Sequence, residues 1–155
     1  MRKRYILFIA FSLGVGGLSA LLTRGNMDLY SEITRPPLSP PSILFPIVWT
    51  VLYILMGIGA AMVWNNRSRD LPAAKSAIRI YAIQLAVNLL WSLIFFNLRA
   101  FLLAFIWLLL LWMLIVMMIS RFSLISVTAG KLQIPYLIWV TFAGYLNLAI
   151  YFLNR

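Results

Sequence analysis

The sequence predicts an all-α integral membrane protein, a bundle of five transmembrane helices that forms one domain over residues 1–155. Two observations carry this prediction. The chain is 64% hydrophobic and only 10% charged, and a soluble domain of this length could not bury so much apolar surface. In addition, five stretches without a charged residue are each long enough to cross a bilayer core of about 30 Å at about 1.5 Å per residue.

The predicted spans are residues 5–23, 43–66, 80–98, 100–120 and 132–154. The first follows a basic N-terminus, as in a signal peptide, but its apolar part exceeds the roughly 7–15 residues of such a segment. We therefore interpret it as a retained helix. Asp70 and Pro72 are typical of a helix cap and first turn, so the third helix is expected to begin before its span. Pro46 and Pro135 fit the first turns of the second and fifth helices.

The basic residues predict the orientation of the bundle. With the N-terminus inside, nine Lys and Arg residues lie on the inner side and four on the outer side, which follows the positive-inside rule. The inner set is Arg2, Lys3, Arg4, Arg67, Arg69, Lys75, Arg79, Arg121 and Lys131, and the outer set is Arg24, Arg35, Arg99 and Arg155. We expect an N-in/C-out protein, most consistent with a bacterial cytoplasmic membrane. The net charge of +10 then reflects orientation and contact with anionic lipids, not nucleic-acid binding.

The residue types that the chain lacks exclude several kinds of chemistry. Cysteine and histidine are absent, which removes disulfides, thiol catalysis and the usual protein ligands for zinc, iron–sulfur clusters and haem iron. The predicted spans contain no carboxylate, and the chain has no catalytic triad or phosphate loop. Conventional acid–base or nucleophilic catalysis is not expected, and no cofactor or metal is predicted.

Small residues follow one face of the first helix. Ser12, Gly16 and Ala20 are spaced four apart, a pattern that lets a second helix approach closely. This face either packs within the bundle or forms a contact between two copies of the chain.

The loop over residues 24–42 is the one long connection that the sequence predicts. Pro36, Pro37, Pro40 and Pro41 favour a stiff, polyproline-like path, so less entropy is lost when the loop becomes ordered. Loops of this length are often functional lids. A rigid linker without a further role is the alternative.

Polar and aromatic residues form a stripe on each of three predicted helices. Trp49 and Tyr53 lie on the second helix, Gln84, Asn88 and Trp91 on the third, and Tyr136, Trp139, Ala143 and Asn147 on the fifth. Counting from the outer helix ends places Trp49, Trp91 and Asn147 in one layer, with Gln84 and Trp139 deeper. The stripes therefore converge beneath the loop, which indicates a cavity with aromatic walls and few polar groups. The amides have a second interpretation, as hydrogen bonds between helices. Trp64 is interpreted as an anchor at the inner interface.

Three motifs carry a resemblance to a known family. They are RPPLSPP-x4-FP-x2-WT-x2-Y-x2-MG-x6-W, then QLAVNLLWSLIFF, then PYLIWVTFAGYLN. In this order they closely resemble the tryptophan-rich sensory protein family, also known as the translocator protein or peripheral benzodiazepine receptor family. The likeness covers nearly the whole chain.

The resemblance implies a receptor for porphyrins such as protoporphyrin IX, and for benzodiazepine-type and isoquinoline carboxamide drugs. Homodimers are typical of the family. Mapped onto this chain, the implied pocket residues are Ala20, Thr23, Tyr30, Pro41, Phe45, Pro46, Trp49, Asn88, Trp91, Trp139, Ala143 and Leu146, with Leu103, Ile106 and Leu110 placed less securely. Tyr53 and Asn147 join them from the stripes. Where animal members carry a tyrosine in a cholesterol motif, this chain has Leu148, which argues against a sterol ligand.

Three functions stay open at this stage. The first is a membrane receptor or binding protein for porphyrins and similar planar apolar molecules. The second is an enzyme-like, light- and oxygen-dependent breakdown of porphyrin, in which the resemblance implicates Trp49 and Trp139. The third is transport of porphyrin or lipid, although five helices without repeats offer little for alternating access.

Overall fold

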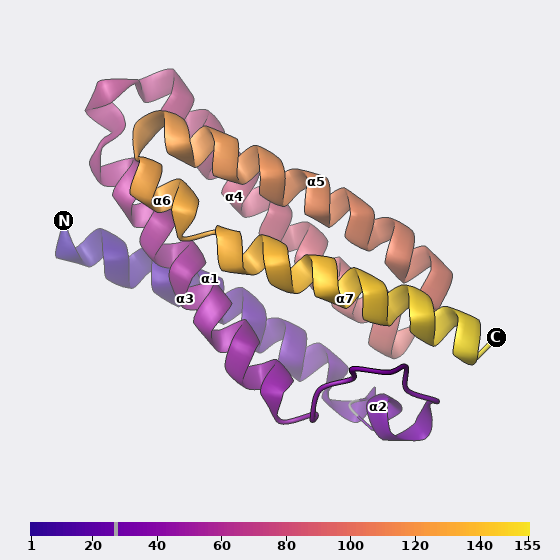
Figure 1. Ribbon diagram of the computed structural model, residues 1–155. Helices are drawn as coiled ribbons and strands as arrows, with labels where there is room; N and C mark the ends of the chain where they lie inside the picture. Colours follow the sequence, from indigo (N-terminus) through magenta and orange to yellow (C-terminus); the bar gives the residue numbers. More distant parts are fainter. Residues whose placement is uncertain (27) are drawn as a thin grey trace.

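The computed structural model describes residues 1–26 and 28–155, and within them the chain forms helices and no strand. Five helices are long and apolar enough to cross a membrane, as the sequence predicts. The chain ends lie at opposite ends of the bundle (Figure 1), which is the arrangement that an odd number of spans requires. Which end faces the cytoplasm stays a prediction from the charge distribution.

The long helices are α1 (Arg2–Thr23), α3 (Leu44–Asn65), α4 (Leu71–Ser92), α5 (Phe101–Ile125) and α7 (Ile134–Leu153). α4 continues through a π-helical turn, η3 (Leu93–Asn97). Its N-terminus is the predicted one, because the Asp70 carboxylate accepts a hydrogen bond from the Ala73 N–H and a proline occupies the first turn. Pro135 likewise lies in the first turn of α7.

Two helix boundaries differ from the predicted spans. α5 runs beyond residue 120 to Ile125, and a separate short helix, α6 (Val127–Lys131), precedes α7. The spans were bounded by charged residues, but a charge does not end a helix: the long Arg121 side chain reaches the Ser76 hydroxyl of α4 instead. The chain turns at Ser126, whose hydroxyl accepts the Ala129 N–H at 3.3 Å and so caps α6.

Close approach of helices holds α1 to the bundle. A Cβ atom on Gly16 would lie 2.5 Å from the Tyr53 ring, and one on Gly57 would lie 2.5 Å from the Ile9 Cα, so a larger side chain at either position would push α1 and α3 apart. The Ser12 hydroxyl is hydrogen-bonded to the Tyr81 hydroxyl of α4. Packing within the bundle is therefore confirmed for Ser12 and Gly16. Ala20 is exposed, and a homodimer contact stays a prediction.

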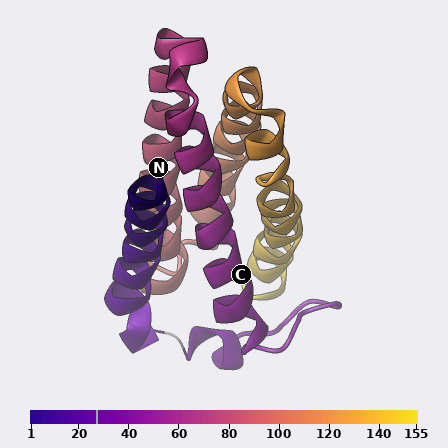
Figure 2. The same cartoon turned by 90° about the vertical axis from the view of Figure 1, so that its left-hand side faces the viewer.

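The long loop carries two short helical turns, η1 (Arg24–Asn26) and α2 (Leu29–Glu32), before the proline segment. Leu29 is fully buried and so fixes α2 to the end of the bundle. The loop covers the end that holds the C-terminus, where α3 and α7 separate from each other (Figures 1 and 2).

Candidate functional site

Six aromatic side chains beneath the loop form a group that we call the aromatic cluster: Tyr30, Phe45, Trp49, Tyr53, Tyr136 and Trp139. The Phe45 ring of α3 lies edge-on to the Trp139 ring of α7, with centroids 5.7 Å apart. One turn deeper, the Trp49 ring meets the Tyr136 ring at 6.1 Å, again edge-on. The cluster therefore fills the space between α3 and α7 with rings instead of aliphatic side chains.

The loop supplies the roof of the aromatic cluster. The Tyr30 ring packs edge-on against Phe45 at 5.2 Å, and its hydroxyl donates to the Pro40 carbonyl at 2.7 Å. The Arg35 guanidinium lies over the Tyr30 ring, 5.0 Å from its centroid. Pro41, in the loop, and Pro46, in the first turn of α3, are both exposed.

A hydrogen-bonded triad forms the floor. The Tyr136 hydroxyl donates to Gln84 Oε1 at 2.7 Å and accepts from Asn88 Nδ2 at 2.8 Å. All three side chains are buried, and burial of unpaired amides in a membrane is costly. The interpretation of Asn88 and Gln84 as hydrogen bonds between helices is thus confirmed, and Asn88 holds Tyr136 in place from α4.

A second aromatic group, which we call the Trp91 corner, lies at the loop end of α4. The Trp91 N–H donates to Asn147 Oδ1 at 3.1 Å, and the Asn147 amide donates to the Phe101 carbonyl at 2.8 Å. Among the described residues, the ring contacts of Trp91 are with Phe95 at 5.3 Å and Phe96 at 6.4 Å. The structure therefore places Trp91 and Asn147 at one depth, as predicted, but in a bonded corner that joins α4, α5 and α7.

The remaining predicted site residues are dispersed. Thr23 is buried with its hydroxyl bonded to the Ser19 carbonyl, Leu146 is buried, and Ala143 is half-buried beside Trp139 on α7. Three candidates on α5 point away from the bundle core, with side chains exposed by 49%, 55% and 41%: Leu103, Ile106 and Leu110. The structure does not bring these three to the aromatic cluster.

Two residues were left out of the predicted site. Tyr136 is the central ring of the floor, and its signal was present in the sequence, because it is three residues from Trp139 on the same stripe. Arg35 stands next to the first proline pair, where the sequence indicated only a loop charge.

One fully buried polar atom of the aromatic cluster has no hydrogen-bond partner. The Trp139 Nε1 is buried and makes no hydrogen bond within residues 1–26 and 28–155. A buried donor without an acceptor costs about 1–3 kcal/mol. The indole N–H groups of Trp91, Trp107 and Trp112 all have acceptors, and among the tryptophans of the described residues Trp139 is the one whose indole nitrogen is fully buried without an acceptor.

Four contacts fasten the loop to the rest of the bundle, one of them the 2.8 Å hydrogen bond from Asn26 Nδ2 to Asn97 Oδ1. Glu32 forms an ion pair with Arg99 at 2.9 Å, between half-exposed side chains. The Asn154 side chain exchanges two hydrogen bonds with the Thr34 backbone, at 2.8 and 2.9 Å. Tyr145 donates its hydroxyl proton to the Pro37 carbonyl at 2.6 Å. The roof is thus held in place by side chains that a bound molecule need not touch.

The arrangement offers stacking, apolar contact and a buried donor without a partner, the Trp139 N–H. The chain's acidic residues are Asp28, Glu32 and Asp70, all outside the long helices, and no group of metal-ligating side chains occurs in the described part. Such a site suits a planar, largely apolar ligand with an acceptor atom.

Comparison with known proteins agrees with the fold and the motifs. The model of the TspO/MBR family matches residues 8–153. The chain is 39% identical to the tryptophan-rich protein TspO of Chlorobaculum tepidum over 129 residues, which cover 81% of this chain and 78% of that protein. It is 32% identical to the tryptophan-rich sensory protein of Cereibacter sphaeroides over 158 residues, covering 99% and 95%.

Similarity extends to animal proteins. The chain is 30% identical to the human translocator protein over 143 residues, which cover 92% of this chain and 85% of the human one. The chain has five helices that are long and apolar enough to span a membrane, and the family model matches nearly its whole length. The chain therefore belongs to the TspO/MBR family.

Proposed function

We propose that this membrane protein is a receptor or binding protein for porphyrins and similar planar apolar molecules, including benzodiazepine-type and isoquinoline carboxamide drugs. The observation that carries the proposal is the aromatic cluster with the unpartnered Trp139 N–H, beneath a loop that other helices hold in place. The family supports it, since relatives carry the names translocator protein and tryptophan-rich sensory protein.

The energetics favour a ligand that replaces ring contacts with better ones. Each edge-on aromatic pair contributes about 0.5–1.5 kcal/mol beyond its buried area. A flat molecule inserted between Phe45 and Trp139 loses one such pair, but gains two stacked faces and gives the Trp139 N–H an acceptor. A ligand without an acceptor gains less.

The roof favours a ligand with an anionic edge. The Arg35 guanidinium lies over the Tyr30 ring, and the Arg35 side chain is exposed. The carboxylate substituents of a porphyrin would extend toward this charge while the ring stays among the aromatic side chains. Glu32, the acidic residue nearest to Arg35 in the sequence, forms its ion pair with Arg99 instead.

Titration with protoporphyrin IX tests the proposal, with the porphyrin absorption band as the readout so that removal of an indole does not change the probe. Trp49→Phe combined with Trp139→Phe is expected to weaken binding by about tenfold, since two indole contacts of about 0.5–1.5 kcal/mol each are altered. Trp112→Phe is the matched control, because Trp112 is exposed and bonded to Thr141. Saturable binding that is unchanged in the double variant would contradict this site.

Light-dependent porphyrin breakdown is the second candidate, and one feature favours it. The Trp49 indole contacts two phenol rings, Tyr53 at 5.8 Å and Tyr136 at 6.1 Å, so an oxidisable side chain has oxidisable neighbours. With light and dissolved oxygen supplied, this role predicts a distinct product formed over several turnovers. Bleaching no different from that of free porphyrin, in protein that binds porphyrin saturably, leaves binding as the function.

A further inference from the structure

A surface cavity lies at the opposite end of the bundle from the loop. It has a volume of about 340 Å³ and is lined by Arg4, Asn65, Arg67, Ser68 and Leu71. These residues come from the first turn of α1, the end of α3, the η2 turn (Arg67–Arg69) and the start of α4. The cavity is thus placed where helices leave the apolar core and lipid headgroups begin.

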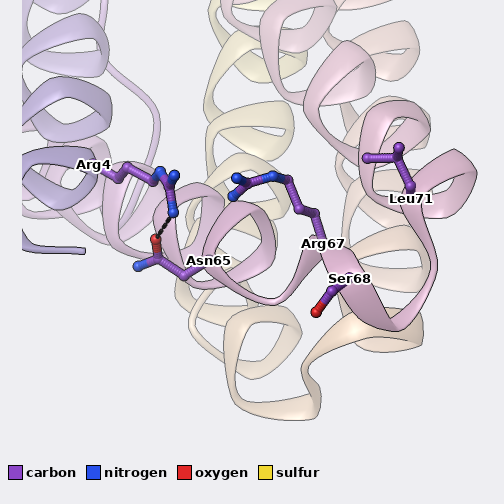
Figure 3. A pocket seen from close by; sticks show the side chains of 5 residues that line it. All are labelled: Arg4, Asn65, Arg67, Ser68 and Leu71. Carbon is purple, nitrogen blue, oxygen red and sulfur yellow. Dashed lines mark hydrogen bonds between the residues drawn. The ribbon is translucent and has the colours of Figure 1, made fainter.

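Two guanidinium groups face this cavity. Figure 3 shows the Arg4 and Arg67 side chains turned toward one space, with Asn65 beside it. Arg4 Nη1 donates to Asn65 Oδ1 at 3.0 Å, and Arg67 Nη1 donates to the Trp64 carbonyl at 2.8 Å. Each guanidinium has five N–H donors, so most of them remain for a ligand.

Neither arginine is paired with a carboxylate among the described residues. Their partners are an amide oxygen, a backbone carbonyl and the Trp64 ring, whose centroid lies 5.0 Å from Arg67 Cζ. No carboxylate lines the cavity: Asp70, the acidic residue nearest in sequence, caps α4, and the other two acidic residues lie in the loop at the far end. The cavity therefore holds two positive charges that are oriented but not neutralised by an ion pair.

The remaining walls match a phosphodiester. The Asn65 amide nitrogen and the Ser68 hydroxyl are neutral donors, suited to phosphate oxygens. Leu71 is an apolar side chain of the lining with 44% of its surface exposed. A charged centre beside an apolar side chain describes a phospholipid better than a water-soluble anion.

We propose that this cavity is a binding site for the phosphate group of an anionic phospholipid in the leaflet around the N-terminal end of the bundle. Arg4 and Arg67 hold the phosphate oxygens, and Leu71 contacts the first part of an acyl chain. A lipid held there joins α1 to the α3–α4 turn, which are otherwise linked at this corner by the Arg4–Asn65 hydrogen bond. The site is separate from the aromatic cluster and does not depend on porphyrin binding.

Native mass spectrometry of the full-length protein with phosphatidylglycerol tests the site. The double variant R4Q/R67Q is expected to bind the first lipid about 25-fold more weakly, about fivefold for each arginine near an anionic lipid. The control R2Q/K3Q removes the same charge from two exposed side chains of the same helix end that do not line the cavity, and is expected to change affinity by less than about threefold.

Three outcomes would overturn the proposal. One is an equal loss in R4Q/R67Q and R2Q/K3Q, which would indicate diffuse surface charge. Another is equal affinity for phosphatidylcholine and phosphatidylglycerol. The third is displacement of the bound lipid by millimolar inorganic phosphate, which would indicate a free-anion site. If the double variant does not fold, R67Q alone decides the matter, because Arg67 bonds only within its own turn and its loss breaks no contact between helices.

Discussion

The two aromatic groups at the loop end of the bundle are alike in composition and opposite in bonding. In the Trp91 corner, the indole N–H, both ends of the Asn147 amide and the Phe101 carbonyl are all paired. In the aromatic cluster, the Trp139 N–H is buried without an acceptor. A paired group contributes to stability, whereas an unpaired donor costs stability until a ligand supplies the acceptor. We propose that the Trp91 corner is structural and that the aromatic cluster binds ligand, so variants of the first should change stability and variants of the second should change affinity.

The largest effect is expected from breaking the corner at its centre. Asn147→Ala removes two hydrogen bonds between helices and leaves the Trp91 N–H unpaired, while the Phe101 carbonyl keeps only its bond within α5. We expect the free energy of unfolding in mixed micelles to fall by about 2 kcal/mol. Porphyrin affinity should change by less than about twofold in the folded fraction. A loss of affinity without a loss of stability would show that the corner belongs to the binding site.

The next effect concerns the unpartnered donor. Trp139→Phe keeps a ring against Phe45 but deletes the N–H, so we expect porphyrin affinity to fall about fivefold, the value of one hydrogen bond of about 1 kcal/mol. The free energy of unfolding should not decrease by more than about 0.5 kcal/mol, because no hydrogen bond of the free protein is lost. A clearly destabilised variant with wild-type affinity would show that Trp139 serves stability and not binding.

Trp91→Phe is the matched counterpart of Trp139→Phe. It deletes an N–H that is used, so Asn147 Oδ1 loses its donor, and we expect the free energy of unfolding to fall by about 1 kcal/mol. Porphyrin titration should give the wild-type affinity. If both tryptophan variants changed the same quantity, the two groups would not differ in role.

The smallest effect is expected from the loop. Glu32→Gln breaks the ion pair with Arg99, whose side chains are about half exposed, and such pairs contribute about 0–1 kcal/mol. Stability should change by less than about 0.5 kcal/mol. Stopped-flow dissociation of porphyrin should be faster by about twofold, because the roof retains its Asn154 and Tyr145 contacts. A dissociation rate that is unchanged would show that this ion pair does not hold the roof over a ligand.

The spans and the depths of side chains were predictable because each depends only on position along the sequence. Uncharged length determined the five helices, and counting from helix ends placed Trp91 level with Asn147, which are hydrogen-bonded. The rotation of a helix about its axis was less predictable. α5 is apolar on every side, so periodicity does not reveal which face is buried, and the three α5 candidates are exposed.

The hydrogen-bond partners of the intramembrane amides could not be predicted from the sequence either. Asn88 and Asn147 are alike as intramembrane amides, and the sequence allowed each to bind a ligand or a neighbouring helix. In the folded chain they bond to Tyr136 and to the Phe101 carbonyl, contacts that depend on how α4, α5 and α7 pack. The roof was predicted as proline-rich and stiff, but the atoms that fasten it, such as Asn154 to Thr34, lie 120 residues apart in sequence.

The indole N–H signals in a ¹H–¹⁵N NMR spectrum, recorded before and after addition of protoporphyrin IX, test the central claim most directly. Each tryptophan gives one signal, assigned by its Phe variant. We predict that the Trp139 signal moves most and becomes protected from exchange with water, while the Trp91 signal, already bonded to Asn147, moves little. A spectrum in which Trp91 responds and Trp139 does not would contradict the account.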